Sequence, residues 1–189
     1  MGECEFTKGP LVVAVGQAIE ELSVDTEPMS VLTPGGRFQV VWDPRGNVTA
    51  MGQLGFFGEY LEMTDLFRNW VGDCPLVYTS GNAPAVRDVL GTWMLSILDG
   101  QWRYAHVASL RGDGVAPDIL GMTSLVGDES LRRGLKLIAP APKATDTEEQ
   151  QAQKEAQLKR AEEWMERSLL ERVKPAMTHG WILDCDTTV

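Results

Sequence analysis

The stretch VRDVLGTWMLSIL, residues 86–98, carries the clearest periodic pattern in the chain. Its apolar residues recur in alternating steps of three and one, which places them on one face of an α-helix. These residues are Val86, Val89, Leu90, Trp93, Met94, Ile97 and Leu98. Gly100 follows, and a glycine just beyond the last periodic residue is typical of a helix end. The pattern therefore predicts a helix at the centre of a helical core.

Shorter helices are predicted on both sides of this central segment. Residues 54–70 show helical spacing with a plausible cap at Thr64, which predicts two short helices. Residues 102–110 predict another helix, and Pro117 begins a further short one that ends near Gly121. The chain is thus expected to be mainly α-helical.

A long charged helix is predicted after a proline-containing linker at residues 139–144. Thr145 and Glu148 have the spacing of a capping box, which indicates the start of a helix that runs to residue 173. Its few apolar residues do not keep a heptad repeat, so a spacer packed on one face is favoured over a dimerising coiled coil.

A β-hairpin is predicted near the front of the chain. Residues 38–42 and 48–51 are rich in β-favouring residues, and the turn-forming sequence DPRGN at residues 43–47 separates them. Residues 25–36 contain two prolines and a glycine pair, which predicts a surface connection. A short helix is expected before it, at residues 12–22.

Composition restricts the class of protein. The 189 residues are 43% hydrophobic, which is enough to build one good core. No run approaches the roughly 18 to 20 apolar residues of a membrane span, and the start, MGECEFTKGP, does not resemble a leader peptide. A cytoplasmic protein is expected. Cys4, Cys74 and Cys185 lack the spacing of a zinc site or disulfide framework, which predicts free thiols.

The formal net charge of −10 argues at first sight against a nucleic-acid partner, because Lys and Arg neutralise phosphates in duplex binding. The acidity lies mostly at the front of the chain. Residues 1–75 contain four Lys or Arg against eleven Asp or Glu, residues 76–140 contain six of each, and residues 141–189 contain seven against ten. This distribution weakens the objection for the middle of the chain.

The segment from Pro117 to the end of a predicted helix at residues 129–138 resembles a helix-turn-helix: short helix, turn, second helix. Arg132, Arg133 and Lys136 lie on the outward side of the second helix, where a recognition helix carries the cations that meet phosphates or guanine edges. Without a family resemblance, the pattern favours an ordinary solvated helix face over a DNA contact, since acidic residues lie nearby.

Two further groups of residues have a functional and a structural interpretation. Arg111, beside a Gly-Asp-Gly sequence, could contact a phosphate, although a structural contact to an Asp or a helix end is favoured. Trp93, Trp102 and Tyr104 could stack on bases, but their places on or beside the apolar helix favour core packing.

Three blocks of sequence are distinctive when taken together. They are TPGGRFQVVWDPRGN at residues 33–47, RDVLGTWMLSILDGQWRYAHVASLRGDGVAPDILGM at residues 87–122 with ESLRRGLK at residues 129–136, and WILDCDTTV at residues 181–189. These blocks resemble the DDE transposases of bacterial insertion sequences. The resemblance covers most of residues 25–189, and the central block is its most specific part.

The resemblance implies an N-terminal helical region that binds the element's ends and a ribonuclease H-like domain that cuts and joins DNA. The expected fold is mainly α with a small β-hairpin, a helix-turn-helix-like N-terminal region, and the first strand of a truncated ribonuclease H-like α/β domain. The expected divisions are an N-terminal extension (1–34), the hairpin with short helices (35–75), a DNA-binding helical region (76–140), a linker with the long charged helix (141–178), and the start of the catalytic domain (179–189).

The closing Asp-Thr-Thr matches the first catalytic acid of the family, which assigns Asp186 as a catalytic and metal-binding residue. In that family two Asp and a Glu hold two Mg²⁺ ions, which lie roughly 3.5 to 4 Å apart and stabilise the attacking and leaving oxygens. The other two acids are expected downstream of Val189. The chain is therefore not expected to catalyse the reaction alone.

The leading hypothesis is a transposase fragment that binds double-stranded DNA at the element's ends, as a homodimer or paired with full-length transposase. The alternative is an acidic helical interaction protein that binds or inhibits the full-length transposase without contacting DNA. A third hypothesis is a nuclease that a second chain completes. None of the three involves a membrane.

Overall fold

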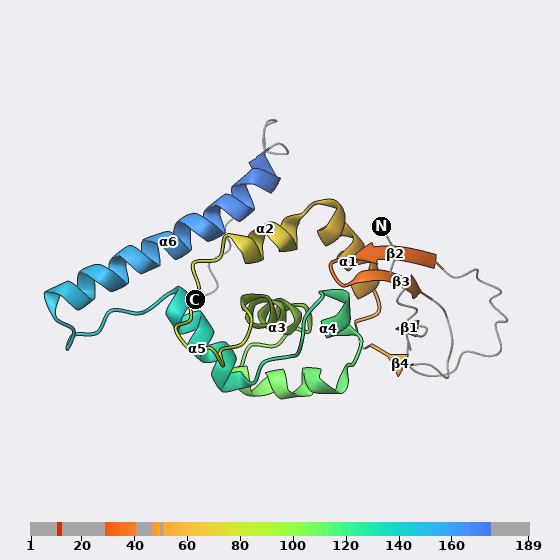
Figure 1. Ribbon diagram of the computed structural model, residues 1–189, viewed down its shortest axis with the longest axis horizontal. Helices are drawn as coiled ribbons and strands as arrows, with labels where there is room; N and C mark the ends of the chain where they lie inside the picture. The colour runs from red at the N-terminus through yellow and green to blue at the C-terminus, as the bar shows by residue number, and fades with distance from the viewer. Residues whose placement is uncertain (1–10, 13–28, 41–46, 50, 175–189) are drawn as a thin grey trace, which may run out of the picture.

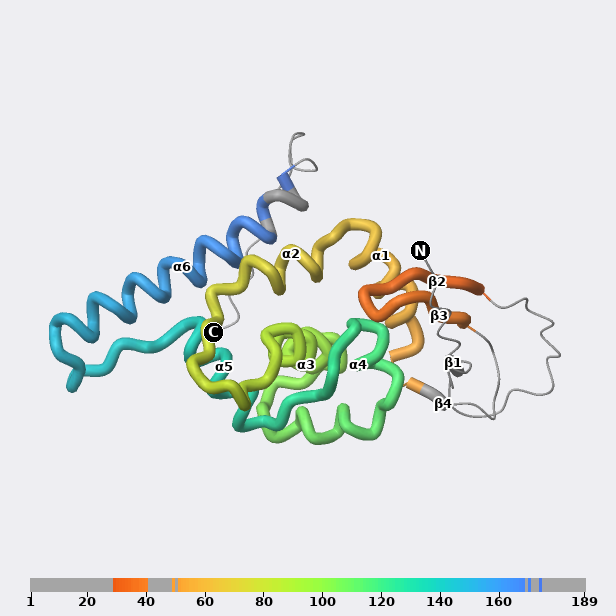
Figure 2. Tube along the Cα trace, in the orientation of Figure 1, coloured from red at the N-terminus to blue at the C-terminus, as the bar shows by residue number. Residues whose placement is uncertain are grey.

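The computed structural model describes residues 11–12, 29–40, 47–49 and 51–174, with helices as the main elements and a small sheet. Figures 1 and 2 show the arrangement, with the sheet at one end and α6 crossing the other. The elements are β1 (Leu11–Val12), β2 (Met29–Thr33), β3 (Gly36–Val40), β4 (Asn47–Val48), α1 (Leu54–Met63), α2 (Leu66–Gly72), α3 (Val86–Leu98), the 3₁₀ helix η1 (Tyr104–Gly112), α4 (Ala116–Ile119), α5 (Asp128–Ile138) and α6 (Glu148–Val173).

The helix α3 lies at the centre of the helical part, as its periodicity predicts (Figure 1). It contacts α2, α4, α5 and η1. Val89, Leu90 and Leu95 are fully buried, and each such side chain contributes about 1.5 to 3 kcal/mol when removed from water. The last turn differs from the prediction, because Ile97 and Leu98 remain about half exposed.

Polar side chains on α3 hold the connection between α4 and α5. Asp88 accepts a hydrogen bond from the backbone N–H of Thr123 at 2.8 Å, and Oγ1 of Thr92 accepts one from the N–H of Val126 at 3.1 Å. Asp88 and Thr92 are both buried and lie one helical turn apart. The connection between α4 and α5 is therefore fixed to the central helix, and this fixes the start of α5.

We expect the variant Thr92→Val to lose about 1 to 3 kcal/mol of unfolding free energy, because valine fills the same space but leaves the buried N–H of Val126 unpaired. The variant Thr92→Ser keeps the hydroxyl and loses one methyl group, so it should lose only about 1 kcal/mol. Urea denaturation followed by circular dichroism measures both. A serine variant less stable than the valine variant would contradict this role of the hydroxyl.

The β-hairpin forms upstream of the predicted place. Its strands are β2 and β3, paired antiparallel with Val31 opposite Phe38, and its turn is Pro34-Gly35. The prediction that residues 38–42 pair with residues 48–51 is wrong. Proline followed by glycine suits the two central positions of a tight turn. The described part of the predicted surface connection, residues 29–36, is therefore strand β2, its turn and the start of β3. The hairpin runs across the predicted division between residues 34 and 35.

Two shorter strands complete the four-stranded sheet of the described residues, in the order β2-β3-β1-β4. β1 pairs in parallel with both β3 and β4, so β4 is not the partner that the sequence predicted for β3. Val12 belongs to β1 rather than to the helix predicted at residues 12–22; residues 13–28 lie outside the described part.

The two short helices predicted at residues 54–70 are confirmed as α1 and α2. α1 packs on β2, and its glycines allow the close approach. A Cβ on Gly55 would lie 3.5 Å from Cγ2 of Val40, and one on Gly58 would lie 2.7 Å from Cγ2 of Ile119. The missing side chain at Gly58 thus allows α1 to pack closely on both the hairpin and α4.

The long helix is confirmed as α6, but its capping box is wrong by two residues. Thr147 accepts a hydrogen bond from the N–H of Gln150, and the Gln150 side chain accepts one from the N–H of Thr147. Asp146 instead closes the preceding turn: its carboxylate accepts from the N–H of Lys143 and pairs with Lys154. The Thr-x-x-Glu/Gln spacing of a capping box occurs twice in this segment, once from Thr145 and once from Thr147. Because Asp146 closes a turn with Lys143, the helix begins after Thr147.

Tryptophan packing attaches α6 to the helical core. The Trp164 ring stacks on Trp70 with centroids 5.3 Å apart, and its Nε1 donates a hydrogen bond of 2.9 Å to the backbone oxygen of Trp70. The ring of Trp93 in α3 also lies beside Trp70, with the two ring centroids 5.8 Å apart. Among the described helices, none has the length and apolar character needed to cross a membrane.

Candidate nucleic-acid interface

The helix α5 has one buried side and one charged side. Leu131, Gly134 and Ile138 are buried. A Cβ on Gly134 would lie 2.8 Å from Cγ1 of Val89, which shows how closely α5 approaches α3. The opposite side of α5 is therefore available to a partner.

The three cations predicted for this helix lie on its exposed side. The side chain of Arg132 is 39% exposed and that of Arg133 is 72% exposed. Lys136 is exposed and lies three and four residues further along, so the three side chains are neighbours on the helix surface. No ion pair holds Lys136 among residues that the structure describes.

Glu129 binds both arginines in the absence of a partner. It accepts hydrogen bonds from Nε and Nη2 of Arg132 at 2.8 and 2.6 Å, and from Nε of Arg133 at 2.7 Å. The hydrogen bond from Arg132, followed by that from Arg133, lowers the pKa of the Glu129 carboxyl. Glu129 in turn raises the pKa of Arg132. Glu129 and Arg132 therefore both remain charged at neutral pH.

The structure brings Arg111 to the start of the same helix. Arg111 lies in the last turn of η1, and a Cβ on Gly127 would lie 3.2 Å from its Nη2. Gly127 directly precedes α5. The described ion pairs do not include an Arg-to-Asp contact of Arg111, and its guanidinium lies beside Gly127 at the start of α5.

The neighbouring Asp113 has a structural role instead. Its Oδ1 accepts hydrogen bonds of 2.9 Å from the N–H groups of Val115 and Ala116, at the start of α4, and Oγ1 of Thr49 donates to its other oxygen. An Asp that binds backbone N–H groups two and three residues ahead is a common turn device, so the sequence contained this signal.

The geometry of the α4–α5 pair differs from a standard helix-turn-helix. α4 is four residues long, and residues 120–127 separate it from α5. This connection is longer than the roughly three- or four-residue turn of the motif. Hydrogen bonds that the connection donates to Asp88 and Thr92 of α3 hold it, in place of a tight turn.

The prediction of core packing is wrong for Trp102. Its side chain is 89% exposed, and Tyr104 is 43% exposed, while Trp93 packs against the core. The predicted helix at residues 102–110 is the 3₁₀ helix η1, which begins only at Tyr104. Trp102 therefore lies in the loop that follows Gly100 and is not directed inwards.

Asp186 lies outside the described residues, so the predicted metal ligand has no described surroundings. Within the described ranges, no three His, Cys, Asp or Glu side chains come together as a metal site.

No family model, curated protein or solved structure matches this chain. The candidate interface is therefore described from the exposure, charge and contacts of this chain's residues alone. Sequence reasoning placed the cations on α5 but did not show that Glu129 binds both arginines. The spacing contained that signal, because Glu129 lies three and four residues before them.

Proposed function

We propose that this chain is the DNA-binding N-terminal part of a DDE-type transposase, and that α5 meets the DNA at the element's ends. The observation that carries the proposal is the exposed group of Arg132, Arg133 and Lys136 with Arg111 at the start of the same helix. Residues 129–136 also belong to one of the sequence blocks that resemble this family.

The exposed cations of α5 suit a helix that enters a major groove. An α-helix fits that groove, and its exposed cations can reach phosphates and guanine edges there. In this proposal α4 and α5 act as the helix-turn-helix-like unit, with α5 in the role of the recognition helix. Asp88 and Thr92 fix the connection between them and so hold α5 in position for binding.

Glu129 opposes this binding. A phosphate that approaches Arg132 and Arg133 must replace a carboxylate that already accepts three or more hydrogen bonds from them. The carboxylate then lies near the phosphate and repels it. Removal of the Glu129 charge should therefore tighten binding to any duplex.

In the same proposal Asp186 is one carboxylate of a Mg²⁺ site, and the metal supplies charge stabilisation during strand cleavage and transfer. No catalytic step is assigned to the residues that the structure describes.

A fluorescence anisotropy titration with a labelled duplex that carries the element's end tests the proposal. The double variant Arg132→Ala/Arg133→Ala should bind about tenfold more weakly at low salt, because two phosphate contacts are lost. The slope of log K against log salt should fall by about 2. The variant Glu129→Gln should bind severalfold more tightly than the unmodified chain.

The double variant Lys159→Ala/Arg160→Ala is the matched control. It removes the same formal charge from α6, where the Lys159 side chain is 76% exposed. An equal loss in this control would show that net charge, and not the α5 surface, determines binding. No binding of any duplex at low salt would refute the proposal.

The net charge of −10 favours a second candidate, an acidic helical protein that binds full-length transposase without contacting DNA. It predicts that the chain binds the full-length protein at low salt, binds no duplex, and is unaffected by the two arginine substitutions.

A further inference from the structure

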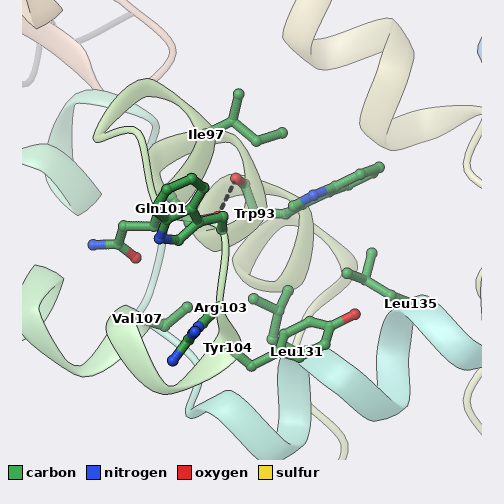
Figure 3. A pocket seen from close by; sticks show the side chains of 10 residues that line it. Trp93, Ile97, Gln101, Arg103, Tyr104, Val107, Leu131 and Leu135 are labelled. Atoms are coloured by element: carbon green, nitrogen blue, oxygen red, sulfur yellow. Dashed lines mark hydrogen bonds between the residues drawn. The ribbon is translucent and has the colours of Figure 1, made fainter. Parts of the chain in front are cut away.

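A small pocket adjoins the charged side of α5. It has a volume of about 220 Å³ and lies between the end of α3, the loop that follows it, η1 and α5 (Figure 3). Its apolar walls include Trp93 and Ile97 of α3 and Leu131 and Leu135 of α5. Arg132 and Lys136 directly follow these two leucines in sequence, so the pocket and the cations share one helix.

Aromatic and cationic side chains alternate at the rim of this pocket. Trp102, Arg103 and Tyr104 are consecutive and all line it, and all three are exposed. Trp102, at 89% exposed, presents most of an indole ring to any ligand that approaches. The rim can thus bind an aromatic ring and a negative charge side by side.

One of the polar side chains that line this pocket, Gln101, has its amide held in place. Nε2 of Gln101 donates to Oδ2 of Asp99 at 2.6 Å and to Oγ of Ser109 at 2.9 Å. These two bonds hold the amide in one orientation. Its Oε1 is buried and has no hydrogen-bond partner in the described part of the chain. An unpaired acceptor on a residue of the pocket lining favours a ligand that brings an N–H donor.

We propose that this pocket binds one unpaired nucleobase of the DNA that α5 contacts. A base is planar and stacks on an exposed indole, its edge carries N–H donors, and its phosphate lies within reach of Arg103 or Arg132. The pocket is too small for a base pair, so the base must come from a single-stranded end or an opened pair. This inference rests on the proposed function and adds a preference for DNA that is not fully paired.

The test compares a blunt duplex with the same duplex extended by a short single-stranded run of thymidines, both titrated at one salt concentration. The extended duplex should bind about tenfold more tightly, because each stacked base adds to affinity. In the variant Trp102→Ala the ratio of the two affinities should fall to about one, and Trp102→Phe should keep part of the difference. A 2-aminopurine in the overhang should lose fluorescence on binding only when Trp102 is present.

The variant Met63→Ala is the matched control, since Met63 is an 80% exposed apolar side chain on α1, away from the pocket. It should keep the full affinity ratio. Thermal melts establish that each variant folds. Equal affinity of the unmodified chain for the two duplexes, or an unchanged ratio in Trp102→Ala, would refute the pocket proposal alone. Failure to bind either duplex would refute the proposed function as well.

Discussion

The variant Gly35→Ala should lose at least about 4 kcal/mol of unfolding free energy, which is a large part of the stability of a domain of this size. A Cβ on Gly35 would lie 1.6 Å from the backbone oxygen of Asp118 and 3.1 Å from the N of Gly121. These are backbone atoms and cannot rotate away. The hairpin would have to separate from α4, and the hydrogen bond of 2.9 Å from the Gly35 N–H to the oxygen of Ile119 would be lost.

Thermal and urea denaturation followed by circular dichroism measure this loss. The control is Gly72→Ala at the end of α2, where a Cβ would meet no atom within 4 Å. That variant should be as stable as the unmodified chain or more so by about 0.5 to 1 kcal/mol, because alanine favours a helix. A Gly35→Ala variant that unfolds at the same urea concentration as the Gly72→Ala variant would contradict the close packing of the hairpin turn.

The variant Trp164→Ala should detach α6 and cost about 3 to 5 kcal/mol. Trp164 is only 3% exposed, and its loss removes both the ring stacked on Trp70 and the hydrogen bond to the Trp70 backbone. The remaining contacts of α6 with α2 and α5 are limited, so the loss should be concentrated in α6. Hydrogen exchange resolved along the chain should show fast exchange of the α6 amides while those of α3 stay protected.

Two variants separate the causes of this effect. Trp164→Phe keeps an aromatic ring but loses the N–H donor, so it should cost about 1 to 3 kcal/mol. Met165→Ala changes the neighbouring side chain, which is 44% exposed, and should change stability by no more than about 0.5 kcal/mol. If Met165→Ala increased exchange in α6 as much as Trp164→Ala, the tryptophan contact would not be what holds the helix.

The helices could be predicted from the sequence because a period of 3.6 residues is a local property. α3 and α5 begin and end within about a residue of their expected places. The long helix was also found, although its cap was assigned to Thr145 instead of Thr147. In that segment two overlapping cap patterns compete, and only the turn around Asp146 distinguishes them.

The hairpin and the pocket could not be predicted because both depend on contacts between distant segments. Pro34 and Gly35 read equally well as part of a surface loop, and the strand before them is identified only by its pairing with β3. Trp102 follows an apolar helix, so a core position was favoured, but the chain turns at Gly100, which has a φ of 68°. The positions of the α5 cations followed from helix geometry, while their partner remains a prediction.

The three tryptophans that join α3, α2 and α6 also have an optical consequence. The rings of Trp70 and Trp164 are nearly parallel, with an angle of 10° between them, and Trp93 lies beside Trp70. Indoles this close couple their electronic transitions weakly, and this coupling contributes to the circular dichroism of the aromatic bands. The aromatic circular dichroism of the protein thus reports, without a label, whether the longest described helix is packed on the core.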